Sequence, residues 1–306
     1  MVGGKVSTLV FLLIIAPVSF ADDLPNVAQG AQATSLTGDA LFAAVPGQEA
    51  LDRLAAAKKD YDDNPHDADN IIWYGRRTAY AGDYRGAIEI FSIGIKEFPQ
   101  DARMYRHRGH RYISIRAFDR AIEDLENAAT LIEGTENEIE PDGLPNALNI
   151  PISSLHGNTW YHLGLAYYLK HDWKNARRAY LAGFNAGRND DNRVSTTHWL
   201  YMILRRMGEN QAADEVLEVI TADMQVIENT VYHNLCLFYK GEITLDEMLG
   251  DDADSPTGAA AAYGIANWYY YNGDDEQAQT RLESLLATDG WSAFGYIAAE
   301  ADLAAR

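Results

Sequence analysis

The amino-acid sequence predicts an all-α protein, an α-solenoid built from helix–turn–helix repeats. A shift of 34 residues places small residues on small residues and large apolar residues on large apolar ones, and such a period is typical of a solenoid. Each copy divides into two helical patterns separated by a short turn. The 306 residues are 47% hydrophobic and 23% charged, which is enough apolar material for a continuous core.

Residues 1–21 have the three parts of a secretory signal peptide. Lys5 supplies the positive start, Leu9 to Ala16 the apolar run, and Ser19 to Ala21 the cleavage site. Pro17 ends the apolar run well short of the ~20 residues that a membrane span requires. We therefore expect cleavage near Ala21, an exported protein that is periplasmic or secreted by a bacterium, and no stable membrane anchor.

The rest of the chain divides into a leader and a helical region. Residues 22–47 contain few large apolar groups and are expected to form a flexible leader. The solenoid is expected at 48–306, with an entry helix at Gln48–Tyr61 and a closing, Ala-rich helix at Trp291–Arg306. Such terminal helices cover the open ends of a solenoid.

The first complete copy shows why a repeat folds as a helix pair. Its helices are predicted at Ile71–Tyr80 and Tyr84–Phe98, because Pro99 ends the second one. Gly75 is small, so the two helices can approach closely, and the same residue type recurs 34 residues later. Phe91 then fills the space between neighbouring pairs.

The third copy carries the most specific motif. Along the chain its key residues are Trp160, Leu163, Gly164, Tyr167, Ala176 and Tyr180. They match the pattern W-x2-L-G-x2-Y followed by A-x3-F, so the chain resembles the tetratricopeptide repeat (TPR) family and, with its export signal, the bacterial envelope type of that family. The resemblance implies a right-handed superhelix whose first helices line a concave groove.

The later copies are less regular. Leu204, Gly208 and Ala213 mark a fourth copy, Val231–Leu249 a degenerate helix pair, and Ala266 to Leu282 a last copy. An irregular, acidic and proline-rich loop at 133–155 interrupts the period. Insertions between repeats emerge as loops on one edge and often serve binding.

The resemblance also selects candidate partner-binding residues on the groove side of the first helices. Arg and Tyr dominate among them, a composition typical of recognition surfaces. The candidates are Arg76, Tyr80, Arg103, Arg106, His110, Tyr161, Tyr168, His198 and Arg205.

The charge pattern indicates the chemistry of the partner. A formal net charge of −20 disfavours nucleic acid. Between Arg76 and Arg120 ten basic residues stand against five acidic ones, whereas from Lys240 to Arg306 three basic residues stand against thirteen acidic ones. Because Arg holds carboxylates bidentately, we expect an adaptor or scaffold that binds an acidic or amphipathic segment of a protein or peptide in the groove.

Three alternatives stay open. The arginines can instead pair with acids of the solenoid itself and cover surface only. The opposite charges of the two halves are compatible with a head-to-tail homo-oligomer. A glycan or small-ligand binding module of the cell envelope is the other class, with an aromatic groove formed by Trp160, Tyr161, Tyr168 and Trp199.

Catalytic and metal-binding patterns are missing from the sequence. It has no phosphate-binding Gly-rich loop, no nucleophile elbow and no metal-binding His motif, so we expect neither an enzyme nor a cofactor or metal site. Cys236 is the one cysteine and is expected to be buried and inert. Arg108 stands in the helix-packing seam, where it is expected to pair with Glu123 or Asp124 or to extend toward solvent.

Overall fold

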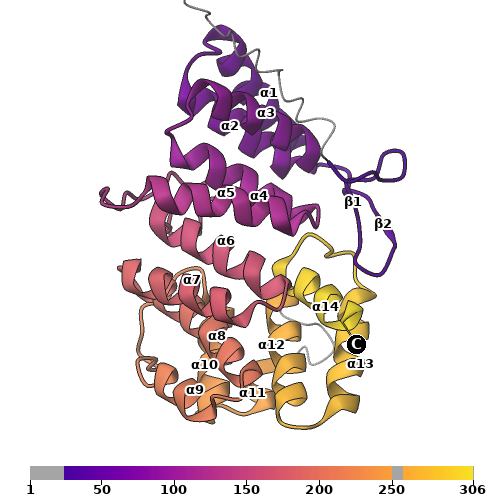
Figure 1. Cartoon of the computed structure of the whole chain (residues 1–306), viewed down its shortest axis with the longest axis vertical. Helices are drawn as coiled ribbons and strands as arrows, with labels where there is room; N and C mark the ends of the chain where they lie inside the picture. The colour runs from indigo at the N-terminus through magenta and orange to yellow at the C-terminus, as the bar shows by residue number, and fades with distance from the viewer. Residues whose placement is uncertain (1–23, 250–257, 306) are drawn as a thin grey trace, which may run out of the picture.

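The computed structural model describes residues 24–249 and 258–305 (Figure 1), so the predicted signal peptide at 1–21 lies outside the described residues. Within these ranges the chain is all-α apart from a two-stranded antiparallel sheet, β1 (Ala33–Thr34) and β2 (Ala40–Leu41). The helices are α1 (Gln48–Asp63), α2 (Ala68–Tyr80), α3 (Tyr84–Glu97), α4 (Ala102–Ser114), α5 (Phe118–Leu131), α6 (Leu155–Leu169), α7 (Trp173–Ala186), α8 (Asp190–Arg206), α9 (Asn210–Leu217), α10 (Thr230–Lys240), α11 (Leu245–Leu249), α12 (Gly258–Tyr271), α13 (Asp275–Leu286) and α14 (Phe294–Ala304). None of the described helices is long and apolar enough to cross a bilayer.

The helices follow one another as packed pairs, from α2 with α3 to α12 with α13, and successive pairs stack to form a helical-repeat solenoid (Figure 1). This architecture confirms the predicted fold class. The degenerate pair expected at Val231–Leu249 is present as α10 and the five-residue α11. The irregular segment expected at 133–155 separates α5 from α6.

Small residues lie under large ones where the two helices of a pair cross. A Cβ atom added at Gly75 would be 2.6 Å from the ring of Phe91, and one added at Gly164 would be 2.6 Å from the ring of Tyr180. Atoms in a close-packed interior cannot approach so closely, so these two seams require glycine. The interpretation of the repeat from residue spacing is confirmed at both positions.

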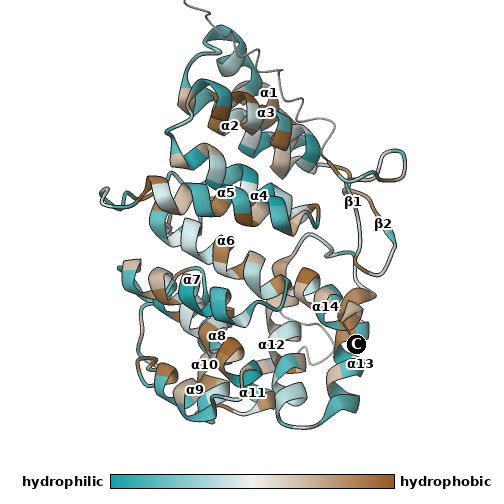
Figure 2. Ribbon diagram, viewed as in Figure 1, coloured by the Kyte–Doolittle hydropathy of each residue, from teal (hydrophilic) through white to brown (hydrophobic). Residues whose placement is uncertain are grey.

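An aromatic cluster fills the middle of the molecule. The rings of Trp199 and Tyr180 are stacked with centroids 5.9 Å apart. Tyr168 is also buried there, and its hydroxyl lies 2.6 Å from the hydroxyl of Tyr263 in α12. Cys236 is buried beside this cluster, where burial raises the pKa of its thiol as expected for an inert cysteine. Figure 2 shows hydrophobic residues around α8 and α10 and hydrophilic ones on the outer turns of α13.

The closing helix does not simply extend the end of the solenoid. Instead α14 packs on α12, α13 and α6, and Figure 1 shows it beside the middle of the stack. Glu300 of α14 pairs with Arg116, which follows α4, and Nε of Arg116 lies 2.9 Å from a Glu300 oxygen. Asp302 pairs with Arg206 at the end of α8. These buried carboxylates tie the chain end to the second and fourth repeats.

The turn after α4 holds a non-glycine residue in the left-handed region of backbone conformation. Arg116 has a φ of 65°, at the position where the first repeat has Gly82 with a φ of 90°. A non-glycine residue in this left-handed region is uncommon and costs about 1 kcal/mol. From this turn the Arg116 guanidinium pairs with Glu300 of α14.

Residues 24–47 differ from the flexible leader that the sequence predicts at 22–47. Ala33 in β1 is only 1% exposed. The backbone carbonyls of the segment accept hydrogen bonds from two distant side chains: Arg85 Nη2 donates to Pro25 at 3.0 Å, and Trp291 Nε1 donates to Phe42 at 2.7 Å. The segment is fixed because its carbonyls satisfy donors on α3 and before α14, which composition alone does not reveal.

Candidate functional site

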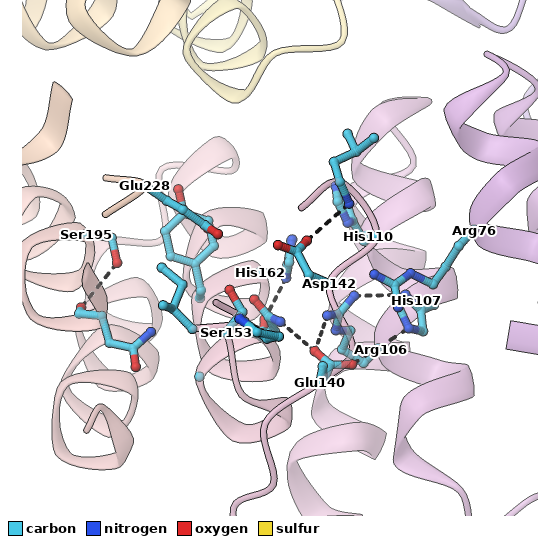
Figure 3. A pocket seen from close by; sticks show the side chains of 18 of the residues that line it. Arg76, Arg106, His107, His110, Glu140, Asp142, Ser153, His162, Ser195 and Glu228 are labelled. Carbon is cyan, nitrogen blue, oxygen red and sulfur yellow. Dashed lines mark hydrogen bonds and ion pairs between the residues drawn. The ribbon is translucent and has the colours of Figure 1, made fainter. Parts of the chain in front are cut away.

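A cavity of about 380 Å³ lies between the first helices of three successive repeats, α2, α4 and α6, and the loop at 133–154. It is the place where the predicted groove and the predicted acidic loop meet. Figure 3 shows Arg76, Arg106 and His107 on one side of it, Ser195 and Glu228 on the other, and Glu140 and Asp142 of the loop between them.

The cationic wall consists of Arg76 from α2 and of Arg106 and Arg111 from α4. Arg106 and Arg111 are buried, at 7% and 9% exposure. The guanidinium of Arg76 stacks on Trp73, 4.4 Å from the ring centre. Three guanidinium groups so close together repel one another unless anionic groups lie beside them.

The acidic loop supplies one such group from within the chain. Glu140 is buried and forms an ion pair with Arg106, and it also accepts a hydrogen bond from Asn158 of α6. Two loop carbonyls accept further bonds, Pro141 from Arg76 Nη1 at 2.9 Å and Gly143 from Arg77 Nη1 at 2.8 Å. The loop therefore lies across the cationic wall as an extended acidic segment.

Backbone hydrogen bonds at the base of the loop hold this segment in place. The backbone N–H of Glu140 donates to the carbonyl of Ser153 at 2.9 Å, and that of Leu155 donates to the carbonyl of Glu138 at 2.9 Å. Ser154 also caps α6 by accepting from the backbone N–H of Gly157. The two ends of the loop are thus close together while its tip extends over α2.

The histidines around the cavity are neutral at neutral pH. Burial lowers the pKa of His162 to about 3, with the charge of Arg106 as a further cause. Burial and neighbouring arginines also lower the pKa values of His107 and His110 well below their usual range. His107 Nδ1 accepts from Arg106 Nη1 at 2.8 Å, so its contact with Glu140 is not an ion pair. The ring centroids of His110 and His162 lie 4.2 Å apart.

The opposite wall is polar and well ordered by hydrogen bonds. The hydroxyl of Tyr161 lies 2.9 Å from that of Tyr232 and accepts from Trp199 Nε1 at 3.0 Å. Asp191 accepts the backbone N–H groups of Ile227, Glu228 and Asn229 at 2.9, 2.8 and 2.8 Å, which fixes the segment that leads into α10. Burial raises the pKa of Glu228 in this segment.

Several buried polar atoms at the cavity lack a hydrogen-bond partner among the described residues. They are Nε of Arg76, Nε of Arg106 and one carboxylate oxygen of Asp142. Buried polar atoms in proteins are nearly always satisfied, by protein, water or ligand. Their convergence on one cavity indicates a place for a polar ligand.

The structure brings five of the nine candidate residues to this cavity and leaves four elsewhere. Those that line it are Arg76, Tyr80, Arg106, His110 and Tyr161. Arg103 is paired with Asp101 and Asp69 outside the cavity. Arg205 donates to the hydroxyl of Tyr201 and stacks on Tyr271. Tyr168 and His198 are each 1% exposed and belong to the core.

The aromatic residues of the glycan alternative are dispersed in the structure. Tyr161 lines the cavity, whereas Tyr168 and Trp199 are 1% exposed within the core. Trp160 is half-buried and packs beside α5. Rings that are enclosed by protein present no face to a sugar, so these residues do not form an aromatic groove.

Sequence reasoning missed the cavity residues Arg111, Asn158 and Phe294. The sequence did contain a reason to include Arg111, since this residue lies in the basic stretch between Arg76 and Arg120 and directly follows His110. No pattern in the sequence indicated Phe294. It lines the cavity because α14 packs back against α6, which places the Phe294 ring centroid 5.3 Å from that of His110. Among the described residues, no group of three or more His, Cys, Asp or Glu side chains is arranged to hold a metal ion.

Comparison with known proteins gave structural similarities only. No family model and no curated protein matches the chain. Among solved structures, it is similar to YrrB, "a TPR protein with an unusual peptide-binding site", with 16% identity and a TM-score of 0.43 over 76% of this chain and 92% of that one. It is similar to the Cut9-Hcn1 structure of the APC/C, with 16% identity and a TM-score of 0.48 over 78% of this chain and 37% of that one. A Podosopora anserina protein of nearly identical TPR-like repeats matches with 16% identity and a TM-score of 0.44 over 73% of this chain and 95% of that one.

The helix pairs and their glycine seams define the class of this protein, a helical-repeat solenoid. It carries a cationic cavity, lined by the first helices α2, α4, α6 and α8, that an acidic segment of its own chain partly covers.

Proposed function

We propose that the chain is an exported scaffold that binds a partner protein through an extended acidic segment, at the cavity between α2, α4 and α6. One observation carries the proposal. The chain's own acidic loop engages the cationic wall with Glu140 on Arg106 and two backbone carbonyls on Arg76 and Arg77. A partner segment of the same chemistry takes over these contacts.

The contacts suit an extended peptide better than a compact ligand. Two of them are made by backbone carbonyls, which every peptide offers, and one by a carboxylate, which selects acidic sequences. Buried charge-assisted hydrogen bonds of this kind are stronger than neutral ones. The role is therefore one of binding rather than catalysis.

The loop itself offers a probe of the proposed site. In a test variant, a short Gly-Ser linker replaces residues 139–153, which is feasible because Glu138 and Leu155 are hydrogen bonded at 2.9 Å. A fluorescein-labelled peptide with the sequence of residues 136–146 is then titrated and followed by fluorescence anisotropy. We expect saturable binding to the loop-replaced chain, weaker binding to the wild type, and weakening by added salt.

Two arginine variants test whether the cationic wall is responsible. In the loop-replaced chain, Arg106→Met is expected to lower the peptide affinity by about 10-fold or more, since a buried charge-assisted contact is lost. Arg177→Met is the matched control, because Arg177 of α7 pairs with Glu209, the residue before α9, and neither residue lines the cavity. No peptide binding, or equal affinities of the Arg106 and Arg177 variants, would contradict the proposal.

The exported location is proposed from the sequence of residues 1–21. It is tested by expressing the full chain in a bacterium, separating periplasm from cytoplasm, and measuring the mass of the recovered protein. A protein in the periplasmic fraction that begins at Asp22 supports export. A full-length protein that stays in the cytoplasm refutes it.

A further inference from the structure

A second cavity, of about 480 Å³, adjoins the cavity described above and shares Arg111 with it. It is enclosed by the entry helix α1, by α2, α3 and α4, and by the tip of the acidic loop. The lining residues are Glu49, Ala50, Arg53, Arg77, Ala79, Tyr80, Tyr84, Arg111, Leu144 and Pro145. Ala79, Tyr80, Arg111 and Leu144 line both cavities.

Arg111 differs from the other buried arginines of the described residues. Arg106, Arg108 and Arg116 are each paired with a carboxylate, from Glu140, Asp124 and Glu300 respectively. Arg111 is just as buried, at 9% exposure, yet within residues 24–249 and 258–305 no carboxylate forms a hydrogen bond or an ion pair with it. Its guanidinium lies over Tyr84, 5.5 Å from the ring centre.

An unpaired buried guanidinium is unfavourable. Burial lowers the pKa of Arg111 from 12.5 to about 10, and the nearby charges of Arg106 and Arg76 act in the same direction. A charge that is largely withdrawn from water without a counter-ion is unfavourable. The side chain of Arg111 nevertheless lines two cavities, where an anion from outside the chain can reach it. This arrangement points to a counter-ion that comes from outside the chain.

The rest of the second cavity is also cationic. Arg53 and Arg77 line it together with Arg111, against the single carboxylate of Glu49, which pairs with Arg53. Arg77 is held in place by its bond to the Gly143 carbonyl, at 2.8 Å. The Tyr80 and Tyr84 side chains form the remaining polar and aromatic surface.

We propose that this second cavity binds a small free oxyanion, such as a phosphate or a carboxylate, with the Arg111 guanidinium as its principal ligand and Arg77 as a second donor. The planar fork of Arg matches the oxygens of both kinds of anion. This site adjoins the proposed peptide site and shares Arg77 with it, whereas the principal ligand Arg111 takes no part in the proposed peptide contacts.

The test uses the full chain in a buffer that contains neither ion. Inorganic phosphate and succinate are titrated separately, by calorimetry and by thermal unfolding, with sodium chloride at the same ionic strength as the reference. We expect at least one of the two anions to bind saturably and to raise Tm beyond the chloride reference, because a ligand that binds only the folded state stabilises it.

Two variants test whether the anion binds at Arg111. Arg111→Met is expected to weaken anion binding by at least about 10-fold. Because it removes an unpaired buried charge, it should not lower the Tm of the unliganded protein, so lost binding is distinguishable from lost folding. Arg177→Met, far from both cavities, is expected to bind the anion like the wild type.

The proposal is overturned if neither phosphate nor succinate binds or raises Tm beyond the chloride reference. It is also overturned if Arg111→Met binds as tightly as the wild type. A marked loss of Tm in the unliganded Arg111→Met protein contradicts the premise that this charge is unpaired.

Discussion

The ion pair of Arg116 with Glu300 joins residues that are 184 positions apart and holds α14 against the end of α4. Both side chains are almost completely buried, at 3% and 1% exposure. Arg116 also donates to the backbone carbonyls of Ser114 and Trp291, at 2.6 and 2.8 Å. Replacing Glu300 by Gln removes the negative charge and leaves the guanidinium buried.

Removal of one partner of a buried pair costs about 3–5 kcal/mol. Because Gln retains one acceptor oxygen and nearly the same volume, we expect Glu300→Gln to lower the free energy of unfolding by about 3 kcal/mol. Urea unfolding at equilibrium measures this change. The control is Glu123→Gln, since Glu123 pairs with Arg120 on the surface at 3.5 Å, and its loss should cost less than about 0.5 kcal/mol.

A double variant separates the energy of the Arg116–Glu300 ion pair from the other effects of each substitution. If the ion pair is responsible, Arg116→Met combined with Glu300→Gln is less destabilised than the two single changes added together, by about 2 kcal/mol. A cost below about 1 kcal/mol for Glu300→Gln, or strict additivity of the two changes, would refute the view that this pair closes the fold.

Three further outcomes are expected. Burial lowers the pKa values of His162 and His198 from 6.5 to about 3 in the folded state, so their contribution to stability is complete above the unfolded pKa and is lost as the pH falls below it. The pKa values of His107 and His110 are lowered as well, so from about pH 7.5 to about pH 5.5 urea unfolding should show a loss of at least about 3 kcal/mol, and a flat profile contradicts this. Gly164→Ala should destabilise by about 1–3 kcal/mol because its Cβ meets the Tyr180 ring at 2.6 Å, whereas Gly290→Ala, whose Cβ meets only Thr288 Oγ1 at 3.6 Å, should be nearly neutral by the same assay. Cys236 is 0% exposed, so a thiol reagent should react with it only after urea unfolds the chain, and rapid labelling of the native protein would contradict the described core.

Local periodicity explains why the repeats could be predicted from the sequence. The seam of Gly75 with Phe91 is set by residues 16 positions apart within one helix pair, and the pattern recurs in later copies. Arg108 was predicted to pair with Glu123 or Asp124 or to reach solvent, and the structure selects Asp124, with two bonds of 2.7 Å. These contacts lie within a single repeat, where spacing along the chain fixes spacing in the fold.

The candidate binding residues were harder to predict because their exposure depends on distant parts of the chain. Tyr168 lies on a first helix, but α12 covers it, and its hydroxyl accepts a bond from Asn267 at 2.8 Å. His198 is covered by α10, where its ring stacks on Tyr232 with centroids 4.6 Å apart. Later helices therefore fill part of the groove in the second half, while the described cavity is lined by α2, α4 and α6 and by the start of α8. No spacing in the sequence indicates this return of the chain.

Contacts inside the fold account for part of the charge asymmetry along the chain. The acids of the C-terminal region are more than surface groups, because Glu300 and Asp302 neutralise Arg116 and Arg206 inside the fold. Glu140 does the same for Arg106 in the groove. An acidic partner must therefore compete with a carboxylate of the chain itself at Arg106. At Arg111 no such competition arises among the described residues, so an anion added to the folded protein should reach Arg111 at lower concentration than an acidic peptide needs to displace the loop.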